Sequence, residues 1–125
     1  MDKSINFLLP YPPSINTYYR TFRGRVLISK QGRVYRKTVE EELAGVSTVH
    51  GRVAVEIRVF PPDRRRRDLD NVQKPLLDAI EHAGVIEDDS MIDDLHTIRG
   101  EQIPDGVVSI TITPIEAKEN KDDNR

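Results

Sequence analysis

The chain has 125 residues with 37% hydrophobic content, which suits one small domain with a core and leaves no room for two domains. Its formal net charge of −2 excludes a uniformly basic surface, and the absence of cysteine excludes disulfides and thiolate chemistry. No apolar stretch is long enough to span a membrane, and the first apolar run is too short for a signal peptide. We therefore expect a soluble protein of the reducing cytoplasm without a membrane partner.

The N-terminal region predicts a strand followed by an irregular loop. Ile5, Phe7 and Leu9 occupy alternate positions, which indicates a strand that ends at Pro10. The segment PYPPSINTYYR, residues 10–20, contains three prolines, which lack the amide proton that helices and sheets use. It therefore predicts a stiff, non-helical loop with aromatic and basic side chains.

A short strand and the first helix are expected next. Residues 25–28 favour a strand, and Gly24 before them favours a turn. Ser29 is a suitable N-cap for a helix that continues to about Val46. The apolar residues of this helix recur at helical spacing and give it one buried face, formed by Tyr35, Val39, Leu43 and Val46.

The second half of the chain predicts three more strands around a second helix. Residues 52–60 alternate most clearly, and the prolines that follow end that strand. The second helix continues to about Ala83, with Gly84 as its C-cap. Further strands are expected at residues 95–99 and around Val108, Ile110 and Ile112.

These elements follow the order ββαβαββ and predict a single small α+β domain. We expect one mixed sheet of about five strands with two helices, within residues 1–115. Residues 116–125 contain almost no apolar side chains and are expected to form a disordered polar tail.

The small net charge conceals a strong asymmetry between the two halves of the chain. Residues 1–67 contain 14 Lys and Arg against 6 Asp and Glu, whereas residues 68–125 contain 5 against 15. The sign changes inside DRRRRDLDN, residues 63–71, where four arginines directly precede two aspartates. A basic surface is therefore expected beside an acidic site.

Pro75 limits where the second helix can begin. Proline is tolerated in the first turn but costs roughly 3 kcal/mol in a helix interior, so the helix is expected to start near Asn71 or Val72. Asp68 and Asp70 would then lie in an extended segment, where residues two apart point in the same direction. Lys74 follows one turn later and is expected close to a ligand held by these carboxylates.

A second acidic segment, EDDSMIDD at residues 87–94, follows the second helix. The spacing does not establish whether this segment returns to Asp68 and Asp70. If it does, three or more carboxylates surround one position, which is a typical site for a hard divalent cation such as Mg²⁺. Arginines beside such a site suit phosphate, because the planar guanidinium donates paired hydrogen bonds.

Simpler interpretations exist for each of these features. Asp68 or Asp70 would also serve as a helix cap, and Asp88 with Asp89 would also form a polar turn. Four consecutive arginines are compatible with a solvated surface. The three histidines have no metal-ligand spacing and are assigned no role.

Several segments, in this order, resemble the RusA family of phage and prophage Holliday-junction endonucleases. They are LPYPPSINTYYR (9–20), RGR (23–25), SKQGRVYR (29–36), DRRRRDLDNVQKPLLDAI (63–80) and AGVIEDD (83–89). The resemblance extends from about Leu9 to Ile112. It implies a small α+β homodimer that binds four-way DNA junctions, requires Mg²⁺ or Mn²⁺, and nicks two strands of like polarity symmetrically in recombination and repair.

The resemblance also implies roles for individual residues. The catalytic, metal-binding aspartates of the family correspond to Asp68, Asp70 and Asp89, and its catalytic lysine corresponds to Lys74. The positions that contact DNA or support the site correspond to Arg64, Arg65, Arg66, Arg67 and Asn71. This chain departs from the family at Pro75 and Leu76 and at residues 47–51, which form a short connection.

The proline-rich loop offers further candidates for DNA contact. Tyr18, Tyr19 and Arg20 are placed to stack on or wedge against bases at the crossover, and a core role for one tyrosine is an equal alternative. Two other classes of function also remain. A non-catalytic junction-binding protein explains the basic half alone, and a metal-dependent nuclease for flaps or other branched DNA would use the same residues.

Overall fold

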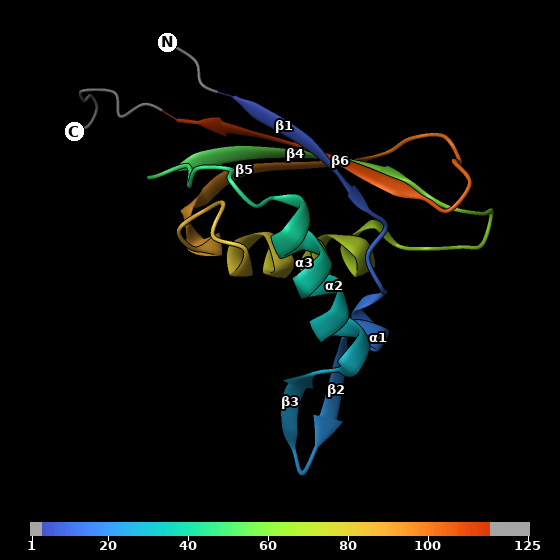
Figure 1. Ribbon diagram of the computed structural model, residues 1–125. Coiled ribbons are helices and arrows are strands. Elements are labelled where there is room, and N and C mark those ends of the chain that lie inside the picture. The colour runs from blue at the N-terminus through green and yellow to red at the C-terminus, as the bar shows by residue number, and fades with distance from the viewer. Residues whose placement is uncertain (1–3, 116–125) are drawn as a thin grey trace, which may run out of the picture.

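The computed structural model describes residues 4–115. Ten elements make up this part of the chain (Figure 1). In chain order they are β1 (Ile5–Pro10), α1 (Ile15–Tyr18), β2 (Tyr19–Phe22), β3 (Arg25–Ile28), α2 (Lys30–Glu42), β4 (Val53–Phe60), α3 (Leu69–His82), the 3-10 helix η1 (Asp89–Met91), β5 (Ile92–Arg99) and β6 (Val107–Pro114). The expected polar tail, residues 116–125, lies outside the described residues, so the domain boundary stays a prediction.

Four strands form one mixed sheet in the order β1-β6-β4-β5. β6 pairs antiparallel with both β1 and β4, whereas β4 and β5 are parallel, with Val53 opposite Ile92 and Val59 opposite Arg99. A parallel connection needs a crossover, and α3 supplies it. The chain therefore leaves β4 at one end of the sheet and enters β5 at the opposite end.

The core lies between one face of this sheet and the helices α2 and α3 (Figure 1). Alternate residues of β4 and β6 point into it, which follows from the two-residue period of a strand. The fully buried residues that fill the core include Val53, Ile57, Val59, Ile110 and Ile112 from the sheet, and Val39, Leu76, Ala79 and Ile80 from the helices.

Most predicted elements are confirmed. Ser29 caps α2, because its hydroxyl accepts a hydrogen bond from the Gly32 amide at 3.0 Å. α3 ends at His82, and Gly84 follows it with a φ of +83°. α2 ends at Glu42, however, and Val46 is 38% exposed, so the expected extension of its buried face to Val46 is wrong.

The predicted count of about five strands in one sheet with two helices is wrong in detail. The described residues contain a four-stranded sheet, a separate two-stranded sheet of β2 and β3, and three α-helices. The proline-rich loop does contain a short helix, α1, because Ser14 follows the prolines and its carbonyl oxygen accepts hydrogen bonds from the amides of Thr17 and Tyr18. The α+β class itself is confirmed.

The start of α3 also differs from the prediction. Asp68 is the N-cap and Asp70 lies in the first turn, so the two aspartates do not share an extended segment. Pro75 lies inside the helix and is buried. None of the helices within residues 4–115 is long and apolar enough to cross a membrane.

The structure predicts that Gly32→Ala destabilises the protein. Alanine normally favours a helix over glycine by about 1 kcal/mol. Here, however, a Cβ atom would overlap the backbone oxygen of Tyr18 and lie 2.8 Å from Ile28 Cγ2. We expect urea unfolding to show a loss of roughly 1–3 kcal/mol, as in other overpacked sites. The control Val34→Ala, at an exposed position of the same helix, should change stability by less than about 0.5 kcal/mol.

Candidate active site

One face of α3 combines the predicted lysine with three carboxylates. Asp70, Lys74, Asp78 and Glu81 are spaced by four, four and three residues, so they lie on one stripe of the helix. Asp70 and Lys74 are exposed, while Asp78 and Glu81 are half-buried. Only the first two were predicted as site residues.

Asp78 connects the three helices. Its carboxylate accepts a hydrogen bond from the Tyr18 hydroxyl at 2.5 Å and from Arg36 Nε at 2.9 Å. Arg36 Nη2 lies 2.8 Å from the same oxygen, and about a quarter of each of the two charged side chains is exposed. Burial, together with the hydrogen bond to Asp78, raises the pKa of Tyr18. α1, α2 and α3 are thus linked through one carboxylate.

Tyr19 lies beside the predicted lysine. Lys74 Nζ lies 5.7 Å from the centre of the Tyr19 ring, within the range of a cation–π contact. Burial raises the pKa of Tyr19, and the negative charges of Asp78 and Asp89 raise it further. The Tyr19 ring thus contacts Lys74, and its hydroxyl lies within the electrostatic range of Asp78 and Asp89.

Three carboxylates converge at the C-terminal end of α3. Glu81, Asp88 and Asp89 each place an oxygen within 4.8 Å of the others, and this is the one such group among residues 4–115. Burial raises the pKa of Glu81, and the neighbouring Asp88 adds to the effect. The Ser90 hydroxyl and Glu81 lower the pKa of Asp88. Oxygen clusters of this kind suit a hard divalent cation.

The other predicted carboxylates lie at the opposite end of the helix. Asp70 and Glu81 are eleven residues apart, which corresponds to roughly 16 Å of helical rise. Asp68, as the N-cap, is further still. The chain therefore brings Asp89 to Glu81 and Asp88, and does not bring it into one cluster with Asp68 and Asp70.

The arginine loop is partly neutralised by the acid that precedes it. Asp63 accepts hydrogen bonds from Arg67 Nη1 at 2.6 Å and from the Arg65 amide at 2.9 Å. The Arg67 guanidinium is the main reason that the pKa of Asp63 falls to about 2. Arg64 and Arg66 are exposed and form no ion pair within residues 4–115, so their charges face the solvent.

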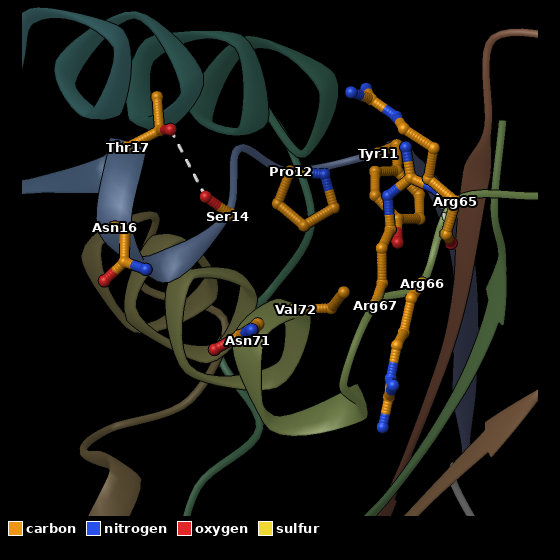
Figure 2. A pocket seen from close by; sticks show the side chains of 10 residues that line it. All are labelled: Tyr11, Pro12, Ser14, Asn16, Thr17, Arg65, Arg66, Arg67, Asn71 and Val72. Carbon is orange, nitrogen blue, oxygen red and sulfur yellow. Dashed lines mark hydrogen bonds between the residues drawn. The ribbon is translucent and has the colours of Figure 1, made fainter. Parts of the chain in front are cut away.

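A hollow of about 400 Å³ lies beside this loop (Figure 2). Arg65, Arg66 and Arg67 line one side, and residues of α1 and its N-cap line the other, with Asn71 and Val72 of α3 below. The Arg67 guanidinium lies over the Tyr11 ring at 5.7 Å. Such a hollow provides several donors for an anionic ligand at the N-terminal end of α3.

The predicted DNA contacts separate into accessible and buried residues. Arg20 is exposed and Asn71 lines the hollow. Tyr18 is fully buried with its hydroxyl on Asp78, so the structure gives it the core role that was the alternative. Sequence reasoning missed Glu81 and Asp78, although their spacing from Lys74 on one helix face was a usable signal.

The fold and this surface define a small α+β domain that places Asp68 and Asp70 beside arginines suited to a polyanion, with a separate carboxylate cluster at the far end of α3. The family model described as Endodeoxyribonuclease RusA matches residues 10–113. The chain therefore belongs to the RusA family.

Known proteins with similar sequences have the same family name. The crossover junction endodeoxyribonuclease rusA of Enterobacteria phage HK97 is 43% identical over 114 residues, which cover 89% of this chain and 95% of the relative. Its counterpart in Enterobacteria phage 82 is 42% identical over 108 residues, 84% of this chain and 90% of the relative. The protein of the same name from Escherichia coli K12 is 40% identical with the same coverage.

We expect Tyr18→Phe to destabilise the protein by about 1–2 kcal/mol. The substitution removes the donor to Asp78 and leaves a half-buried carboxylate with Arg36 alone. Urea unfolding measures the effect. Tyr19→Phe is the matched control, because no hydrogen bond of the Tyr19 hydroxyl is found within residues 4–115. Equal losses for the two variants would contradict the role of the Tyr18 hydroxyl.

Proposed function

We propose that this chain is a structure-selective, divalent-metal-dependent endodeoxyribonuclease that resolves Holliday junctions by paired symmetrical nicks. The main support is the combination of family membership with a surface that places carboxylates, Lys74 and exposed arginines along α3 and its N-terminal loop. The relatives are named crossover junction endodeoxyribonucleases. A four-way DNA junction is the substrate that follows from those names.

The proposed chemistry uses the carboxylates, Lys74 and the arginines in different ways. Mg²⁺, or Mn²⁺ in its place, would polarise the scissile phosphate and favour attack by water when it is bound by Asp68, Asp70 and Asp89. Lys74 stabilises the charge that develops on the phosphate oxygens. Arg64 to Arg67 and Asn71 bind phosphates on either side of the cut, which makes binding strongly dependent on salt.

We further propose that two copies of the chain share each site. Asp68 and Asp70 lie at one end of α3 and Asp89 at the other, so one metal ion does not easily reach all three in a single chain. A twofold dimer that sets the start of α3 in one copy against Asp89 of its partner would complete two identical sites. Two sites related by a twofold axis also match the symmetry of a junction and of paired nicks.

Asp70→Asn is expected to abolish cleavage and to leave junction binding equal or tighter. The change removes a metal ligand and one negative charge near DNA, while an exposed first-turn residue contributes little to packing. The measurement uses an immobile four-way junction, labelled on each strand in turn, with Mg²⁺ and with EDTA. Wild type should produce paired symmetrical nicks that EDTA removes.

Other outcomes of this assay would support other functions. Tight metal-independent binding without cleavage by wild type would indicate a junction-binding protein. Preferential cleavage of a matched flap or duplex would indicate a nuclease of different preference. Continued cleavage by Asp70→Asn would remove that residue from the site.

Mixing Asp70→Asn with Asp89→Asn should restore nicking if two copies share each site. Each protein alone is inactive, but a mixed dimer contains one site with both aspartates intact. Random exchange makes roughly half of the dimers mixed, and one of the two sites in each mixed dimer is intact. The mixture should therefore have about a quarter of the active sites of an equal amount of wild type. Single nicks in one labelled strand report this recovery.

A mixture of Asp68→Asn with Asp70→Asn is the matched control. Both residues belong to the same end of α3, so every site in that mixture lacks one of them. Recovery in both mixtures, or in neither, would contradict a site divided between Asp68 and Asp70 of one copy and Asp89 of the other.

A further inference from the structure

The β2–β3 hairpin extends away from the sheet and the core (Figure 1). It packs at its base against α1 and α2, where the Ser29 amide donates a hydrogen bond to the backbone carbonyl oxygen of Tyr18 at 2.9 Å. An isolated two-stranded hairpin buries little apolar surface and has marginal stability. Most of this hairpin therefore contributes little to the core and is free to contact a partner.

The hairpin exposes apolar side chains among cations. Phe22 is 49% exposed and Val26 is 71% exposed. The guanidinium groups of Arg20 and Arg23 lie 5.4 and 5.2 Å from the centre of the Phe22 ring. Residues 19–28 contain three arginines and no acid, so the hairpin is complementary to a polyanion.

The turn places an arginine where the backbone disfavours it. Arg23 and Gly24 have φ values of +53° and +74°, the pattern of a two-residue type I′ turn. Asn, Asp and Gly are the usual residues at the first of these positions, because a β-carbon is unfavourable at positive φ. The turn therefore holds an arginine at a conformational cost, and such backbone strain is typical of functional positions.

The hairpin is continuous with the proposed active surface. A hollow of about 510 Å³ adjoins Lys74 and is lined on the hairpin side by Tyr19, Arg20 and Val26. Asn16 of α1 lines both this hollow and the one beside the arginine loop. The two hollows therefore meet at α1, with the arginines of the loop at one end and Lys74 and Arg20 at the other.

We propose that the hairpin tip contacts DNA at the branch point, with Phe22 stacked on a base pair that the junction leaves open. The arginines Arg20, Arg23 and Arg25 bind the phosphates beside it. Aromatic side chains stack on bases irrespective of sequence, and apolar wedges enter base steps that are opened. This inference rests on the proposed junction substrate, because an uninterrupted duplex covers the faces of its bases.

Phe22 suits this role better than either tyrosine. Tyr18 is fully buried, and the Tyr19 ring is packed edge-on against Tyr18 at 4.8 Å and against Lys74. Phe22 is about half exposed, lies outside the core cluster of the described residues, and has the guanidinium groups of Arg20 and Arg23 beside its ring. It can therefore stack on a base without loss of core contacts.

The test uses 2-aminopurine at each base that flanks the branch point, in EDTA so that no cleavage occurs. Wild type should raise the fluorescence at the branch point and leave a duplex of the same sequence unchanged. Phe22→Ala should lose this rise and bind the junction about tenfold more weakly. Val34→Ala, an exposed residue of α2, is the matched control and should behave as wild type.

Arg23→Asn separates DNA contact from hairpin folding. Asparagine suits the positive φ, so the melting temperature should stay equal or rise. Junction affinity should nevertheless fall. The slope of log affinity against log salt concentration should decrease in magnitude by about one. Unchanged affinity and salt dependence would remove Arg23 from the contact.

Three outcomes would overturn the inference. Cleavage of junctions by wild type without a fluorescence change would overturn the branch-point contact and leave the proposed function intact. A Phe22→Ala protein that becomes monomeric in sedimentation would show that the hairpin contacts a second copy of the chain instead of DNA. Wild type that neither binds nor cuts junctions would overturn the proposed function and this inference together.

Discussion

The carboxylate of Asp78 is the contact on which the arrangement of the functional surface depends. It accepts hydrogen bonds from Tyr18 and Arg36, and so joins α3, which contributes Asp70 and Lys74, to α1 and α2. Hydrogen bonds to charged groups contribute about 1.5–3 kcal/mol each, a large amount for a domain of this size. Because α1 and α2 also form the base of the β2–β3 hairpin, the same carboxylate sets the hairpin relative to the lysine.

The parallel pairing of β4 and β5 determines which acidic residues can meet. The chain leaves β4 at one end of the sheet and must return to the other end before it enters the parallel strand β5. α3 spans this distance, so its first and last residues lie at opposite ends of the sheet. The acids before and after α3 are therefore at opposite ends, although they are close in sequence. This separation follows from topology, and no side-chain rotation within one chain removes it.

Sequence patterns predicted what depends on local periodicity. The alternation in β4, the Ser29 cap and the Gly84 terminus follow from side-chain direction and backbone preference, and the structure confirms them. The start of α3 was misplaced because Pro75 was expected in the first turn. It is instead the seventh residue of the helix and packs on its buried face. β3 and the turn at Gly24 were predicted, but β2 and its pairing with β3 were missed. The Asp78 contact was also missed, because it depends on the packing of α1 and α2 against α3, which no local pattern encodes.

The position of four arginines beside two aspartates now has a physical explanation in two parts. Asp63 neutralises Arg67 and orients it over Tyr11, which removes part of the repulsion among consecutive guanidinium groups. Asp68 and Asp70 then begin a helix, where negative charge is favoured by the N-terminal end of the helix dipole. The loop and helix are thus stable with both signs of charge adjacent. Residues 63–71 therefore provide both hydrogen-bond donors for phosphate and oxygen ligands for a cation. Folding and the proposed chemistry favour the same sequence here.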